Sequence, residues 1–114
     1  MNFDYQLPED THENRQRDMV YPTRILNNLG GGNFIVMTDA TNMAFTRNTL
    51  EFFIPKNISE ANKIVITYNE NVDRYLMYFV KHDKLKSEVI KQELNLKGSE
   101  LRDKFETNTQ LSTR

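Results

Sequence analysis

Three short segments in the middle of the chain alternate apolar side chains with the two-residue period of a β-strand. They are TLEFFIP from Thr49, KIVITY from Lys63 and RYLMYFV from Arg74. Only short polar connections separate them, and strands joined so closely pair antiparallel. The side chains predicted to face the core are Leu50, Phe52, Ile54, Ile64, Ile66, Tyr75, Met77 and Phe79.

Three consecutive glycines, Gly30 to Gly32, lie before these strands in LGGGNFIVMTDATN. A phosphate-binding glycine loop follows a strand and opens a helix, whose N-terminal amides face the anion. Here the order is reversed. Residues 23–29 read as a short helix capped by Thr23, which Gly30 ends, and residues 34–38 alternate like a first strand. The glycines are therefore interpreted as a helix end, and residues 39–48 as a polar connection.

The last third of the chain favours helices. KLKSEVIKQELNL, residues 84–96, is rich in Glu, Lys and Gln, which favours a helix over 84–95, with a strand as the alternative. Ser99 is suited to cap a second helix over 99–107, in which Leu101 and Phe105 lie one turn apart. The predicted fold is α+β, with a short N-terminal helix and a C-terminal helix packed against a four-stranded antiparallel meander. An edge strand formed by Phe3, Tyr5 and Leu7 would make it five-stranded.

Length and composition limit the classes of protein. The 114 residues suffice for one domain, predicted over 23–114 behind a polar arm over 1–22. Without cysteine, disulfide frameworks, thiolate catalysis and cysteine-ligated metals are excluded. The N-terminus does not resemble a signal peptide, and no apolar run approaches the roughly 18 residues of a membrane helix. We expect a cytoplasmic protein of a bacterial cell that does not enter the membrane.

No catalytic or metal-binding constellation is apparent. His12 has acidic neighbours, but its polar segment lacks the support that a metal site needs. His82 is interpreted as a surface histidine, because no partnered acid accompanies it. No serine stands in a nucleophile-elbow setting. The sequence therefore disfavours an enzyme and predicts no cofactor and no metal.

A nucleic-acid-binding surface is an alternative. RYLMYFVKHDK combines aromatic and basic side chains of the kinds that stack on and clamp single strands. The candidate residues are Arg74, Tyr78, Lys81 and Lys84. A net charge of −1 argues against the basic groove that supplies most of such affinity, so this function is disfavoured.

The order of the segments resembles a known family. The glycine run followed by Phe34, Met37, Thr38, Ala40 and Asn42, then LEFFIP, KIVITYN, RYLMYF and a closing amphipathic helix, is similar to small uncharacterised proteins of bacteriophages, plasmids and other mobile elements. The likeness runs from about Thr23 to about Ser112. It implies a mobile-element origin and an intracellular bacterial setting, but no activity and no site.

The outward positions of the predicted sheet depart from that family, which tends to carry charged residues there. This chain has Phe53, Val65, Leu76 and Tyr78 instead. A contiguous apolar patch of this kind is rarely left open on a soluble monomer. The N-terminal arm could cover it, the chain could form a homodimer through it, or another protein could dock on it. The last reading predicts a non-enzymatic, protein-binding role, such as inhibition of a host-defence component.

Overall fold

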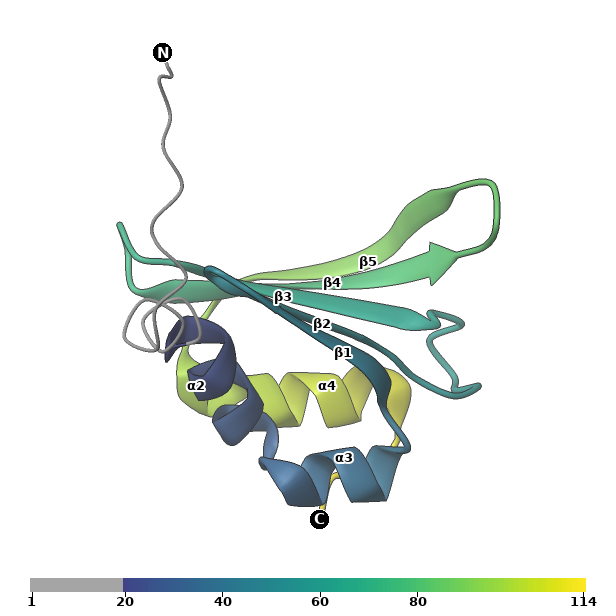
Figure 1. The fold of residues 1–114 in the computed structure, drawn as a ribbon, viewed down its shortest axis with the longest axis horizontal. Coiled ribbons are helices and arrows are strands. Elements are labelled where there is room, and N and C mark those ends of the chain that lie inside the picture. Colours follow the sequence, from purple (N-terminus) through teal and green to yellow (C-terminus); the bar gives the residue numbers. More distant parts are fainter. Residues whose placement is uncertain (1–19) are drawn as a thin grey trace, which may run out of the picture.

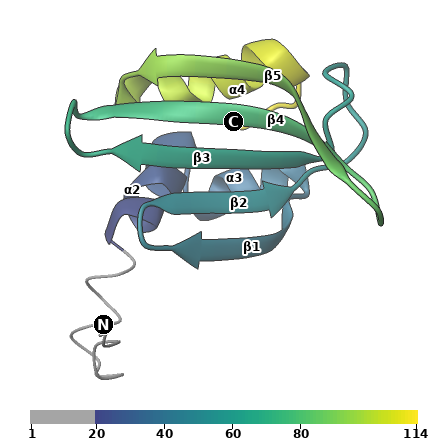
Figure 2. The same ribbon diagram turned by 90° about the horizontal axis from the view of Figure 1, so that it is seen from above.

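The computed structural model describes residues 20–114, which form a five-stranded antiparallel sheet with helices (Figures 1 and 2). The strands follow one another across the sheet in chain order, as a meander. Their bounds are β1 Thr41–Thr46, β2 Thr49–Phe53, β3 Lys63–Asn69, β4 Arg74–His82 and β5 Ser87–Leu96. The predicted α+β class and antiparallel meander are confirmed. The fifth strand comes from the C-terminal third, whereas Phe3, Tyr5 and Leu7 lie outside the described residues.

All the helices formed by residues 20–114 lie on one side of the sheet (Figure 1). They are α2 Val20–Leu29, α3 Gly32–Thr38, the 3-10 turn η1 Gly98–Glu100 and α4 Leu101–Thr109. The core fills the space between them and the sheet. Phe34 of α3 meets both Phe52 of β2 and Phe105 of α4 edge-on, with ring centroids 5.4 and 5.1 Å apart. Every side chain predicted to face the core is buried, so the predicted inner face is confirmed.

The glycines end α2 as predicted. The amides of Gly30 and Gly31 both bond to the carbonyl of Leu26, at 3.1 and 2.8 Å. Both glycines have a positive φ, +131° and +65°, which residues with a Cβ rarely adopt. The helix itself begins at Val20 rather than at Thr23.

The strand predicted over residues 34–38 is wrong, because these residues form the helix α3. Phe34 and Thr38 lie one turn apart and are both buried, and the Thr38 hydroxyl donates to the Phe34 carbonyl at 2.7 Å. Val36, which an alternating strand would have placed beside Phe34, is 76% exposed. Two buried positions at helical spacing therefore decide the conformation.

The polar connection predicted over residues 39–48 is also wrong, because it contains β1. This strand pairs with β2 through an irregular register, and Asn42 within it has a φ of +53°. Phe45 packs against the core. Two apolar anchors, Met43 and Phe45, and backbone pairing with β2 outweigh the polar composition.

The helix predicted over residues 84–95 is wrong as well, because Ser87–Leu96 is the edge strand β5. It pairs with β4 along its length, with two register shifts. Pairing with a neighbouring strand overrides the weak helix propensity of its Glu, Lys and Gln residues. The helix predicted over 99–107 is confirmed as α4, with Leu101 and Phe105 fully buried.

Candidate protein-binding face

The side of the sheet opposite the helices is the candidate site. We call it the outer face. Besides Val80, which is buried opposite Lys63, its central positions, read from the strand register, are Glu51, Phe53, Lys63, Val65, Thr67, Leu76 and Tyr78. These positions alternate along each strand with the buried core residues, so the period of two that builds the core also builds this face.

The register brings the predicted apolar residues together. Val65 of β3 is directly opposite Tyr78 of β4, and Leu76 is the next outward residue along β4. Phe53 of β2 is opposite Lys63, two residues before Val65, which is within reach of a diagonal contact. All four predicted side chains are half-buried in a single chain. They therefore form one surface across three neighbouring strands.

The charges on the outer face neutralise each other locally. Lys63 Nζ lies 2.8 Å from Glu51 Oε1, and the same ammonium group lies 5.6 Å from the centroid of the Phe53 ring. This ring also meets the imidazole of His82 edge-on, with centroids 5.5 Å apart. The centre of the outer face is thus mainly apolar. Its one ion pair is internal, so the face presents no cluster of like charges.

A shallow hollow adjoins Leu76 at one end of the outer face. It encloses about 230 Å³ and is lined by Asn69, Val72, Arg74, Leu76, Leu94 and Asn95. Leu94 is half exposed there. The hollow has room for one apolar side chain, with Arg74 and two amide side chains at its margin.

Within residues 20–114 no helix covers the outer face, and the β4–β5 hairpin bends over one end of it (Figures 1 and 2). A sheet with one face open to water normally carries polar residues on that side. Here two aromatic and two aliphatic side chains occupy its centre. The interpretation that the N-terminal arm over 1–22 covers the patch falls mostly on residues outside the described part. Its residues 20–22 do not cover the patch, because they begin α2 on the helix side of the sheet, where Tyr21 packs against Tyr68.

The candidate nucleic-acid residues are not brought together. Arg74 and Tyr78 are on the outer face, whereas Lys81 lies on the opposite side of β4 and Lys84 is in the turn before β5. Arg74 and Lys81 are seven residues apart on one strand, or roughly 23 Å. These side chains do not form a continuous basic groove.

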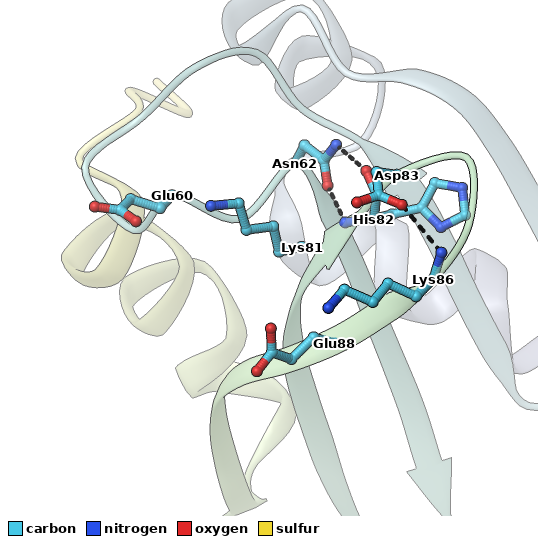
Figure 3. A pocket seen from close by; sticks show the side chains of 7 residues that line it. All are labelled: Glu60, Asn62, Lys81, His82, Asp83, Lys86 and Glu88. Carbon is cyan, nitrogen blue, oxygen red and sulfur yellow. Dashed lines mark hydrogen bonds between the residues drawn. The ribbon is translucent and has the colours of Figure 1, made fainter.

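A polar cleft of about 390 Å³ lies beyond the other end of the outer face (Figure 3). Its lining residues are Glu60, Asn62, Lys81, His82, Asp83, Lys86 and Glu88. The Asn62 side chain donates to the His82 carbonyl and accepts from the His82 amide, both at 2.7 Å, and so extends the pairing of β3 with β4. Sequence reasoning missed this cleft, because residues 84–95 were assigned to a helix.

The cleft has no arrangement for acid–base catalysis. His82 Nδ1 contacts the Ser87 hydroxyl, but the neighbouring Asp83 carboxylate accepts the amides of Leu85 and Lys86, at 2.8 and 3.0 Å. These two bonds lower the pKa of Asp83 and fix the β4–β5 turn. The carboxylate therefore serves the turn and does not orient the imidazole.

Within residues 20–114, no group of three His, Asp or Glu side chains lies close enough to hold a metal ion. His12, the other histidine, is outside that range. None of the helices in the same range has the length and apolar character needed to span a bilayer.

No protein-family model, curated protein or solved structure matches this chain. The resemblance to small proteins of phages and plasmids therefore stays a prediction. The functional proposal depends on the geometry of the outer face.

Proposed function

We propose that this chain is a non-enzymatic protein that binds another protein through the outer face. One observation carries the proposal: Phe53, Val65, Leu76 and Tyr78 lie together on the side of the sheet that no described helix covers. Removing apolar area from water is the main favourable contribution to such an association, and it must exceed the entropy that the two partners lose on binding.

The chemistry of the outer face suits a protein partner. Phenylalanine and tyrosine give large contact areas and lose little side-chain entropy on binding. The hollow beside Leu76 can receive an apolar side chain of the partner, and the Glu51–Lys63 pair, toward the other end of the face, can orient polar groups of the partner. An extended sheet surface with one shallow hollow fits another folded protein better than it fits a small molecule.

The resemblance described above supports a mobile-element origin. On that basis we propose that the partner is a protein of the bacterial host, with a component of host defence as the first class to examine.

The test is affinity capture from host lysate, treated with nuclease, using the double variant Phe53→Asp with Leu76→Asp. The control is Val36→Asp with Ile58→Asp, at positions that are 76% and 62% exposed and lie off the outer face. We expect the wild-type chain and the control to retain the same host protein, and the outer-face variant to lose it. Circular dichroism establishes that each variant is folded.

Three outcomes contradict the proposal. In the first, the outer-face variant retains every protein that the wild type retains. In the second, it unfolds while the control stays folded, so that Phe53 and Leu76 serve the core. In the third, sedimentation shows a wild-type homodimer that this variant abolishes, which assigns the outer face to self-association.

A further inference from the structure

β5 is the last strand of the sheet and presents an open edge. Among residues 20–114 no strand pairs with its far side. Eight of its ten side chains are exposed, Glu93 is intermediate, and Leu96 is buried. Open edges of this kind are templates for pairing with another strand, and proteins normally shorten or block them.

Two bulges confine the regular part of β5 and fix its centre. Lys91, Gln92 and Glu93 pair in regular register with Phe79, Tyr78 and Met77. Between Val89 and Lys91, β5 has one extra residue, because their partners Val80 and Phe79 are adjacent in β4. Between Glu93 and Leu96 it has another, because their partners Met77 and Tyr75 are only two positions apart in β4. The regular stretch is therefore centred on Gln92.

We propose that β5 pairs antiparallel with β5 of a second copy of this chain, about a two-fold axis at Gln92. In that register Lys91 of each copy is directly opposite Glu93 of the other. Ile90 and Leu94 lie at the two bulges that flank this regular stretch. Each dimer thus gains two pairs of opposite charge across the new strand boundary.

Neighbouring registers are unfavourable. Directly opposite residues must point to the same side of a sheet. The two-fold axis must therefore pass through a residue of β5 and not between two residues. Centring on Lys91 places two lysines opposite each other, and centring on Glu93 places two carboxylates opposite each other. Like charges directly opposite destabilise a strand pair. The Gln92 register is the one in which the charges of this strand complement themselves.

The orientation of the side chains agrees with this register. Lys91 and Glu93 pair with the core residues Phe79 and Met77, so both point to the helix side of the sheet. There Asn108 of α4 donates to Glu93 Oε2 at 2.9 Å and positions the carboxylate. Gln92 pairs with Tyr78 and points to the outer face.

Pairing in this way joins the two outer faces. Across the boundary the row Val65, Tyr78, Gln92 continues into Gln92, Tyr78, Val65 of the second copy. A ten-stranded sheet results, with all helices on one side and both outer faces on the other. The inference is independent of the proposed function, because Lys91 and Glu93 lie on the helix side and their substitution leaves the outer face unchanged.

The test is a charge exchange measured by sedimentation with the full chain, at concentrations up to about 100 µM because an edge contact buries little area. We expect the wild type to dimerise. Lys91→Glu and Glu93→Lys should each weaken the dimer about tenfold or more, since each replaces two opposite-charge pairs with like-charge pairs. An equimolar mixture of the two variants should dimerise again, because each then complements the other.

Lys56→Glu is the matched control, since it makes the same charge change at an exposed loop position and should leave dimerisation unchanged. Gln92→Cys checks the register, because the chain has no other cysteine. It should form an intermolecular disulfide that Ile58→Cys does not form. A wild type that stays monomeric, a Lys91→Glu variant that dimerises as the wild type does, or a mixture that stays monomeric overturns the inference.

Discussion

At the residue scale, Glu106 holds the C-terminal segment against α4. Its Oε2 atom accepts from the amide and the hydroxyl of Thr113, at 3.0 and 2.6 Å, and its Oε1 atom accepts from Arg114 at 3.1 Å. Thr113 is fully buried, and Arg102 donates to its hydroxyl and its carbonyl, both at 2.8 Å. The hydrogen bonds from Thr113 are the main reason that the pKa of Glu106 falls from 4.5 to about 2.

This shift predicts the acid sensitivity of the fold. A carboxyl group whose pKa is lowered on folding stabilises the native state above its unfolded pKa, and that stability is lost as the pH falls through the folded pKa. The free energy of unfolding should therefore decrease between about pH 4.5 and about pH 2. Glu106→Gln should flatten this part of the profile, as measured by urea unfolding at a series of pH values. An unchanged slope in the variant would contradict the assignment.

At the element scale, the turn from α2 into α3 depends more on Gly31 than on Gly32. Gly31 has φ +65° and ψ −142°, a region that essentially only glycine occupies. Gly32 is the first residue of α3, and a Cβ added there would meet nothing within 4 Å. The two adjacent glycines therefore have different requirements.

Substituting each by alanine should have opposite effects. Gly31→Ala should lower the free energy of unfolding by about 1–3 kcal/mol, because the new side chain strains the backbone. Gly32→Ala should be neutral or raise it by up to about 1 kcal/mol, because it restricts the unfolded chain. Chemical denaturation measures both. Equal losses at the two positions would show that the turn constrains them alike.

The elements predicted correctly from the sequence are those in which buried residues recur at the spacing typical of the element, every second residue in a strand and one turn apart in a helix. β2, β3 and β4 alternate buried and half-buried residues over most of their length, and α4 buries Leu101 and Phe105 at helical spacing. The failures have physical causes. α3 buries just two side chains in seven residues, so a strand pattern fits its sequence equally well. β5 buries Leu96 alone, so its pairing leaves no apolar period to read.

The candidate site was likewise predictable only where it is formed by strands that were assigned correctly. Phe53, Val65, Leu76 and Tyr78 follow from the period of strands that were assigned correctly, and the register brings them together. The hollow beside Leu76 and the open edge of β5 were not predictable. Both include residues of β5, whose strand conformation depends on pairing with β4 rather than on its local sequence.

At the scale of the whole molecule, the described chain has two layers, with the helices on one side of the sheet and the outer face on the other (Figure 1). The core is complete without the outer face, because the helices contribute Ile25, Leu29, Phe34, Leu101 and Phe105 to it. The four residues of the proposed contact surface, Phe53, Val65, Leu76 and Tyr78, lie outside this core cluster.

The central claim is that the outer face is open in the free protein, and thiol labelling of single-cysteine variants of the full chain tests it most directly. The absence of native cysteine makes each introduced thiol unique. Val65→Cys reports the outer face, Ile64→Cys the adjacent core position, and Ile58→Cys an exposed loop. In native, dilute protein we predict that the thiol at position 65 reacts far faster than the one at 64, approaching the rate at 58. If position 65 is as protected as position 64, the outer face is covered within the chain and is not a docking surface.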